Sequence, residues 1–172
     1  ETSSRRRYRA VTNGDIDILL LESSTWGWEK HDVQFSDPIV TDTDVYLTRS
    51  DHPDRKTLLA DVTKYPILCV LGFHYGFADN NSDPDYLKQN FHVWFRYSEQ
   101  EVLSSLMARE APIAIVSAGF LKRQFVDDPS LRDLVTIGAE PDAEYDLVSV
   151  LSNKSVISSS EFNQLIEQLL AT

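Results

Sequence analysis

The chain has 172 residues, of which 42% are hydrophobic and 25% are charged, a composition typical of a folded globular protein. Sixteen Lys and Arg against 27 Asp and Glu give a formal net charge of −11 at pH 7, so we expect no nucleic-acid partner. The basic run from Arg5 to Arg7 is interpreted as a solvated helix face. No apolar run reaches the ~20 residues that span a bilayer, so we expect no direct membrane insertion.

The first predicted elements are a helix that ends at Asn13-Gly14 and a buried strand at residues 15–22. In that strand an alternating pattern passes into a continuous apolar run, as expected of a strand covered on both faces. Residues 66–71, 112–116 and 145–151 have the same character and are predicted to be strands. Cys69 lies inside one of them, where a lone thiol behaves as a small buried hydrophobe.

Helices are predicted between these strands from their start signals. Ser98 and Glu101 form a capping box, and Ser158 and Glu161 form another, each followed by apolar residues at helical spacing. Asp83 before a proline predicts a further short helix. Strands that alternate with helices indicate an α/β fold with a mainly parallel sheet.

Several motifs, in this order, resemble bacterial type 2 periplasmic solute-binding proteins, of the extracellular solute-binding protein family 3 kind. Residues 13–17 resemble the family's helix end and strand entry, and residues 35–38 resemble its Phe-Ser-x-Pro element before a crossing strand, here 44–48. Residues 59–76 resemble the helix, strand and ligand loop of the second lobe. Residues 98–117 resemble the helix and strand that complete that lobe.

The resemblance implies an α/β, two-lobed type 2 periplasmic-binding-protein-like fold, in which hinge motion closes the lobes on a small molecule. It implies residues 1–45 plus 146–172 as lobe 1 and residues 46–145 as lobe 2. Family members normally have a strand, helix and strand before the helix at which this chain begins. Truncation, an absent amino-terminal piece or a differently built, incomplete first lobe would each account for the late start at Glu1.

In amino-acid-binding relatives an arginine of the first lobe binds the ligand carboxylate, and an acidic residue of the second lobe binds its amine. The corresponding positions here are Glu29 and Ser117, so both charged contacts are missing. A free α-amino acid is therefore a poor ligand, because its carboxylate would face Glu29.

Other residues are candidates because they follow buried strands, where α/β sheets place ligands. Glu22, Ser23 and Ser24 end the first strand and Trp26 follows, although a hydroxyl-rich turn with a packed tryptophan explains them equally well. Aromatic rings after the strand at 66–71 suit a cationic or polar uncharged ligand; the alternative is a plain turn. The predicted ligand-binding residues are Glu22, Ser23, Ser24, Trp26, Glu29, Phe73, His74, Tyr75 and Ser117.

Motifs for catalysis or metal binding are missing from the sequence. The four histidines are scattered, and there is no Gly-x-Ser-x-Gly, Walker-type or Gly-x-Gly-x-x-Gly sequence. We therefore expect no enzyme, no catalytic residue, no metal and no cofactor. The predicted role is that of a periplasmic or extracytoplasmic domain that binds a small-molecule ligand for a membrane transporter or as a receptor's sensor.

Two alternatives remain. The effector domain of a LysR-like transcription regulator shares the two-lobed fold and similar elements, here 51–53 and 60–62, but it would require an amino-terminal helix-turn-helix. A degenerate member could instead have lost its ligand and act as an interaction module.

Overall fold

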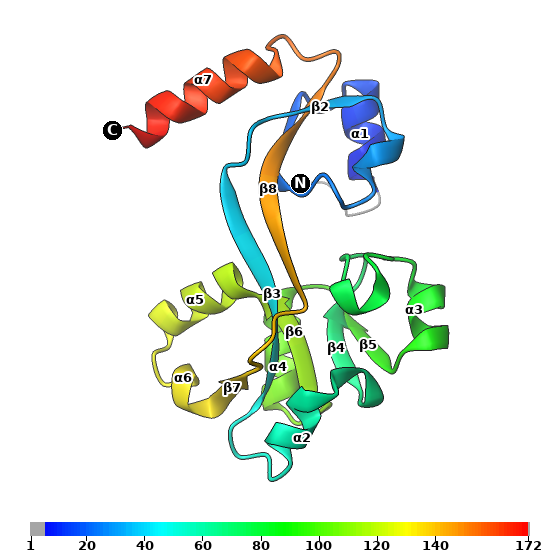
Figure 1. Cartoon of the computed structure of the whole chain (residues 1–172), viewed down its shortest axis with the longest axis vertical. Helices are drawn as coiled ribbons and strands as arrows, with labels where there is room; N and C mark the ends of the chain where they lie inside the picture. Colours follow the sequence, from blue (N-terminus) through cyan, green and yellow to red (C-terminus); the bar gives the residue numbers. More distant parts are fainter. Residues whose placement is uncertain (1–5, 172) are drawn as a thin grey trace. The chain divides into compact units, whose positions relative to one another are not determined.

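The computed structural model describes residues 6–171, which form two compact units (Figure 1). Unit 1 comprises Glu1–Thr41 and Tyr145–Thr172, and unit 2 comprises Asp42–Glu144. Strands β3 (Val40–Arg49) and β8 (Ala143–Ser152) carry the chain from one unit to the other.

The sheet of unit 2 is mixed. Its parallel part consists of β5 (Val93–Arg96), β4 (Ile67–Val70) and β6 (Ile113–Ser117), with β4 in the middle. Strand β3 pairs antiparallel with β6 and with β7 (Val135–Ile137). The prediction of a mainly parallel sheet is thus confirmed only for β4 and β6: β3 runs the other way, and the predicted strands at 15–22 and 145–151 pair antiparallel with each other in unit 1. Residue alternation carries no information about strand direction, which the connections decide.

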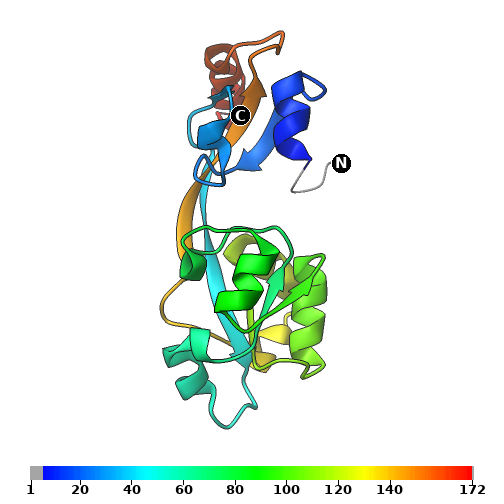
Figure 2. The ribbon, with the colours of Figure 1, turned by 90° about the vertical axis from the view of Figure 1, so that its right-hand side faces the viewer.

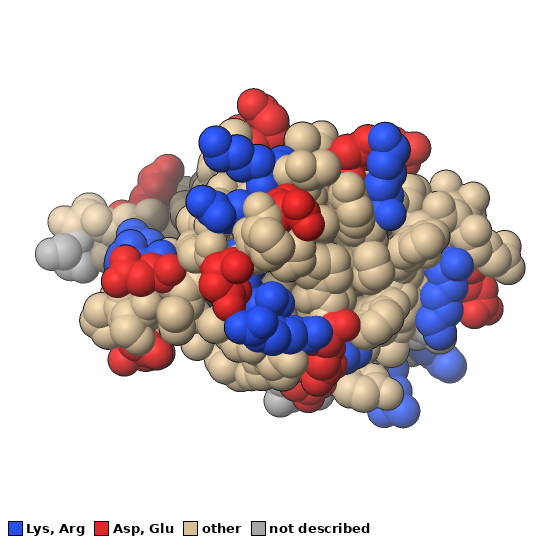
Figure 3. Space-filling model, turned by 90° about the horizontal axis from the view of Figure 1, so that it is seen from below, with Lys and Arg blue, Asp and Glu red and all other residues tan. Residues whose placement is uncertain are grey.

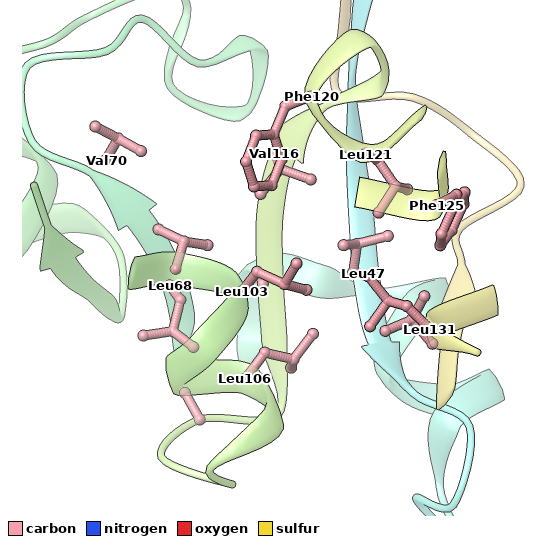
Figure 4. Packing of buried hydrophobic residues seen from close by; sticks show 14 residues of the cluster. Leu47, Leu68, Val70, Leu103, Leu106, Val116, Phe120, Leu121, Phe125 and Leu131 are labelled. Atoms are coloured by element: carbon pink, nitrogen blue, oxygen red, sulfur yellow. The ribbon is translucent and has the colours of Figure 1, made fainter. Parts of the chain in front are cut away.

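Helices lie on both faces of this sheet (Figures 1 and 2). Leu68 and Val70 of β4 pack with α4 and α5 on one face, while Ile67 and Cys69 face the layer that contains α2, η3 and α3. Figure 4 shows the first of these clusters, in which Leu103 and Leu106 of α4 lie against the strands. The helical segments are α2 (Arg55–Ala60), η2 (Val62–Lys64), η3 (Gly76–Ala78), α3 (Pro84–Asn90), α4 (Glu99–Met107), α5 (Ala118–Asp127) and α6 (Leu131–Leu134).

The predicted helix starts are confirmed in unit 2. Asp83 accepts hydrogen bonds from the Asp85 and Tyr86 amides at the start of α3. The Ser98 hydroxyl accepts a bond from the Glu101 amide at the start of α4. The return bond of this capping box goes one residue further back than predicted, because Glu101 accepts from the Tyr97 amide.

Unit 1 is built around β8. Strands β1 (Ile18–Glu22) and β2 (Val33–Phe35) both pair antiparallel with it. Helix α1 (Arg7–Asn13) ends as predicted at Gly14, whose φ of 78° allows the left-handed turn that terminates it. Val11, Trp28 and Val150 form the buried apolar cluster, and Trp28 comes from η1 (Trp28–Lys30).

Helix α7 (Ser159–Leu170) completes unit 1 and begins with the predicted capping box, in which both reciprocal bonds of Ser158 and Glu161 form. Only Phe162 of its apolar residues is buried, whereas Leu165, Leu169 and Leu170 are 50%, 70% and 74% exposed. The described residues contain no helix of sufficient length and apolarity to cross a bilayer. Figure 3 shows acidic and basic side chains interspersed on the displayed face.

Candidate functional site

The carboxyl ends of β4 and β6 lie at one edge of the sheet of unit 2, because the two strands are parallel neighbours. The loop 71–75 follows β4, and Ser117 ends β6 immediately before α5. This edge is where α/β sheets place ligands, and it carries four of the residues that the sequence predicts. The fold thus brings Phe73, His74 and Tyr75 to the same edge as Ser117.

The aromatic residues of the loop have unequal access to solvent. Phe73 is 40% exposed, whereas Tyr75 is 1% exposed and His74 is buried. The Tyr75 hydroxyl accepts a 2.7 Å hydrogen bond from the Val70 amide, and its ring stacks on Phe77 with centroids 5.5 Å apart. In this conformation Phe73 presents a ring to solvent, while Tyr75 belongs to the core beneath the loop.

Ser117 lies against a carboxylate that the sequence analysis did not place there. Its amide donates a 2.6 Å hydrogen bond to Glu99 Oε1, and its hydroxyl caps α5 by accepting from the Phe120 amide at 3.1 Å. The amide of Gly119, the second residue of α5, donates to Asp42 Oδ1 at 3.1 Å. Two acidic side chains therefore meet the start of α5, although Ser117 itself carries no charge.

Burial raises the pKa of Glu99 and the nearby charge of Asp42 raises it further, whereas the hydrogen bonds from Ser117 and the charge of Arg123 oppose this rise. The helix start favours negative charge there, which also limits the cost of ionisation. In the sequence Glu99 stands only as the first residue after the cap Ser98, so its local pattern does not indicate a place in the site. Its place next to Ser117 depends on how α4 packs against β6.

A third carboxylate, that of the half-buried Asp142, holds the residues that follow the loop. Its Oδ2 accepts from the Gly76 amide at 2.6 Å, and its Oδ1 accepts from the Phe77 amide at 2.8 Å and from the Tyr46 hydroxyl. Desolvation raises the pKa of Asp142, and the hydrogen bonds from these three donors oppose this rise. The sequence showed Asp142 only as part of a turn-forming segment, so nothing in the local pattern indicated this contact.

In unit 1, Glu22 is engaged by its own unit. Arg7 Nε lies 3.1 Å from Glu22 Oε2 in an ion pair, and Trp28 Nε1 donates a 2.9 Å hydrogen bond to the same oxygen. Both charged side chains are about nine-tenths buried. Desolvation raises the pKa of Glu22, and the charge of Arg7 opposes that rise. The interpretation of Arg7 as a solvated residue is wrong, because its ion pair with Glu22 draws it into the core.

The other predicted residues of unit 1 follow β1 in an irregular segment. Ser23 is buried with its hydroxyl 2.9 Å from that of Thr25, and Ser24 is exposed. Trp26 is half-buried and meets Tyr145 edge to face at 4.9 Å between ring centroids. Glu29 is exposed at the surface of η1. Ser24, Trp26 and Glu29 thus remain accessible, whereas Glu22 and Ser23 do not.

A pocket of about 460 Å³ is lined by Tyr46, Leu59, Ala60, Asp61, Val62, Thr63, Ala139, Glu140 and Pro141, none of which was predicted to bind ligand. Between residues 6 and 171, no group of three or more His, Cys, Asp or Glu side chains is placed to hold a metal ion.

Comparison with known proteins identifies the fold. No protein-family model matches the sequence, and no curated protein does. Among solved structures, the GluR0 ligand-binding core from Nostoc punctiforme, in complex with L-glutamate, has a TM-score of 0.73 at 18% identity, over 99% of this chain and 74% of that one. A protein described as a binding component of an ABC transporter from Wolinella succinogenes, complexed with lysine, has a TM-score of 0.73 at 12% identity, over 99% and 71%.

A mutant of arginine-bound ArgBP from T. maritima is also similar, with a TM-score of 0.69 at 14% identity, over 96% of this chain and 73% of that one. The chain thus spans about seven-tenths of the length of each of these structures. At such identities the likeness concerns the fold. The chain has the α/β fold of the two-lobed periplasmic binding proteins, as the motifs at residues 13–17 and 35–38 predict.

Proposed function

We propose that the chain is an extracytoplasmic, non-catalytic domain that binds a small cationic or polar uncharged solute, either for a membrane transporter or as a sensor. The observation that carries this proposal is the pair of carboxylates, Glu99 and Asp42, at the candidate edge of unit 2. The fold supports a binding role, since the similar structures are of binding proteins in complex with amino acids.

The charge of this edge favours a cation over an anion. An anion at the start of α5 would meet Glu99 and Asp42, and these like charges would oppose its binding. A cation would neutralise them, and the exposed ring of Phe73, on the loop after the neighbouring strand, would add a cation–π contact of about 0.5–2 kcal/mol. A ligand cation would also lower the pKa of Glu99, because it favours the charged carboxylate.

We assign the solute contacts to accessible residues, with Phe73, Glu99 and Ser117 in unit 2. In unit 1 we propose Ser24, Trp26 and Glu29. The remaining predicted residues, Glu22, Ser23, His74 and Tyr75, are proposed to support the segments that carry these contacts.

A native mass spectrum of the purified protein is the first test. An additional small mass, lost on mild unfolding, would support the proposal and give the ligand's composition. A bound peptide would instead support an interaction module. A bare chain would call for added solutes.

Calorimetric titration with L-arginine, choline and L-glutamate tests the chemical class directly. We expect choline, a cation without the α-carboxylate that would face Glu29, to bind more tightly than L-arginine, and L-glutamate not to bind. Glu99→Gln keeps an oxygen for the Ser117 amide but removes the charge, so it should weaken cation binding about tenfold, equivalent to ~1.4 kcal/mol. The exposed Glu140→Gln makes the same charge change away from the edge and should bind as the parent does. Tighter binding of L-glutamate than of both cations would contradict the proposal.

A further inference from the structure

The loop 71–75 has two ends, and they are held differently. Its first end continues from β4, where the Leu71 amide donates to the Arg96 carbonyl at 2.8 Å and the Phe73 amide to the Val70 carbonyl at 3.3 Å. Gly72, with a φ of 82°, turns the chain between these bonds. The other end enters η3 at Gly76, where the amides of Gly76 and Phe77 donate to Asp142.

Asp142 is itself fixed to the sheet. Its amide donates to the Asp44 carbonyl of β3 at 2.8 Å, and the nearby Gly138 amide donates to the Tyr46 carbonyl at 2.8 Å. The Tyr46 hydroxyl, also from β3, donates to the Asp142 carboxylate. The carboxylate therefore occupies a position set by β3, so the loop end that it holds is positioned relative to that strand.

The backbone at position 76 approaches Asp142 so closely that only glycine fits there. A Cβ built on Gly76 would collide with the carbonyl oxygen of Asp142, and it would also lie 3.3 Å from the carboxylate oxygen Oδ2. Without a side chain, Gly76 can present its amide directly to Oδ2. Gly76 and Asp142 are 66 residues apart in the sequence and form one tight junction.

We propose that Asp142 is a positioning residue for the ligand loop: its carboxylate joins the amides of Gly76 and Phe77 to β3 and thereby sets where the ring of Phe73 stands. This proposal rests on the proposed function for one point only, namely that the loop 71–75 contacts a ligand. The junction itself is a property of unit 2 that can be measured without any ligand. The carboxylate is suited to the task because three donors converge on its two oxygens, and no neutral side chain of that size accepts at both.

Amide hydrogen exchange of the Asp142→Asn variant tests the junction. Asparagine has the same shape, but one of its two terminal atoms is an NH₂ donor, which would face a donor at Gly76, Phe77 or Tyr46. Exchange at Gly76 and Phe77 should accelerate about tenfold or more, while exchange at Leu68 in β4 should be unchanged. Glu140→Gln, an exposed carboxylate in the same connection, is the matched control and should leave all three amides unchanged.

Tyr46→Phe keeps the test decisive if Asp142→Asn does not fold. It removes one donor and leaves the carboxylate, so we expect a smaller, twofold to fivefold acceleration at Gly76 and Phe77. Unchanged exchange at these two amides in the folded Asp142→Asn variant, or in Tyr46→Phe if that variant does not fold, would overturn the proposal.

The titrations described above separate the two proposals. Accelerated exchange in a protein that binds no arginine or choline would confirm the junction and count against the proposed function. If a cationic probe does bind, Asp142→Asn should weaken that binding while leaving the folded fraction unchanged. Equal affinity in the variant with accelerated exchange would show that the junction does not position the ligand loop.

Discussion

Unit 2 buries apolar side chains on both faces of its sheet, whereas unit 1 buries the ion pair of Arg7 and Glu22 beside an apolar cluster of Val11, Trp28 and Val150. In unit 2 the strands are covered by helices on each side. In unit 1 the apolar residues Leu165 and Leu169 of α7 remain at least half exposed.

The difference shows two ways in which the same chain stabilises structure. Apolar burial stabilises unit 2 by about 1.5–3 kcal/mol for each fully buried large side chain. A buried ion pair contributes little net stability by itself, but it makes each partner indispensable to the other, because an isolated buried charge is costly. We therefore expect the stability of unit 1 to depend on its buried charges, and the stability of unit 2 to depend on the volume of its buried side chains.

The largest effect on stability is expected from a substitution at Glu22. Glu22→Gln keeps the acceptor for Trp28 but leaves Arg7 buried without a counter-charge, so we expect the free energy of unfolding of unit 1 to fall by about 3–5 kcal/mol. Chemical denaturation followed by tryptophan fluorescence in a Trp94→Phe background would measure this, since the two remaining tryptophans, Trp26 and Trp28, lie in unit 1.

The double variant Arg7→Met with Glu22→Gln is the control for this prediction. Without either charge the penalty should largely disappear, so the double variant should be more stable than the sum of the single changes predicts. Additive losses would mean that Arg7 and Glu22 contribute independently, and that the ion pair is not what unit 1 depends on.

The dependence of unit 2's stability on buried side-chain volume is tested at Leu106 of α4, which is fully buried against the sheet. Leu106→Ala should lower the free energy of unfolding of unit 2 by about 2–5 kcal/mol through the lost contacts and the cavity left behind. Hydrogen exchange of the β4 amides would report it. Leu169→Ala, the same change at a leucine that is 70% exposed in unit 1, should change stability by less than about 0.5 kcal/mol. Comparable losses at the two leucines would contradict the contrast between the units.

The smallest expected effect is the pH dependence of the free energy of unfolding that desolvated carboxyl groups produce. Desolvation raises the pKa of Glu99 and of Asp142, both in unit 2. Between about pH 4, where the unfolded carboxyls titrate, and the raised folded values, the folded state holds more protons, so stability falls as pH rises. We therefore expect a higher free energy of unfolding at pH 5 than at pH 7.

Glu99→Gln removes one of these groups and should reduce this pH dependence in unit 2, while Glu140→Gln should preserve it. Urea denaturation at several pH values, followed separately for each unit, would measure the slope. A stability that rises from pH 5 to pH 7 would show that hydrogen bonds, rather than desolvation, dominate these carboxyl groups.

Much of the fold was predictable from local patterns. The strands around residues 18, 68, 114 and 148 were found because their apolar runs are continuous, and the helix starts at Asp83, Ser98 and Ser158 because capping needs specific side chains at fixed positions. Strands β2, β5 and β7 were missed. They have three or four residues each, too few for a periodic pattern to stand out.

The candidate site was less predictable. The sequence indicated that Phe73 and Ser117 follow buried strands, which was sufficient to place them at one edge. It gave no sign that Tyr75 would turn inward, because an aromatic residue next to glycine is equally compatible with either direction. Nor did it show that a carboxylate from α4 would stand beside Ser117.

The amino-acid sequence by itself determined the α/β class, the helix caps and the similarity of fold to periplasmic binding proteins, because these follow from periodicity, side-chain chemistry and the order of short motifs. Only the tertiary structure decided that Arg7 is buried against Glu22, that Glu99 meets Ser117 and that Asp142 meets Gly76. Each of these contacts joins residues between 15 and 66 positions apart, and local patterns carry no information about such pairs. The charges of the site and the support of its loop therefore come from packing.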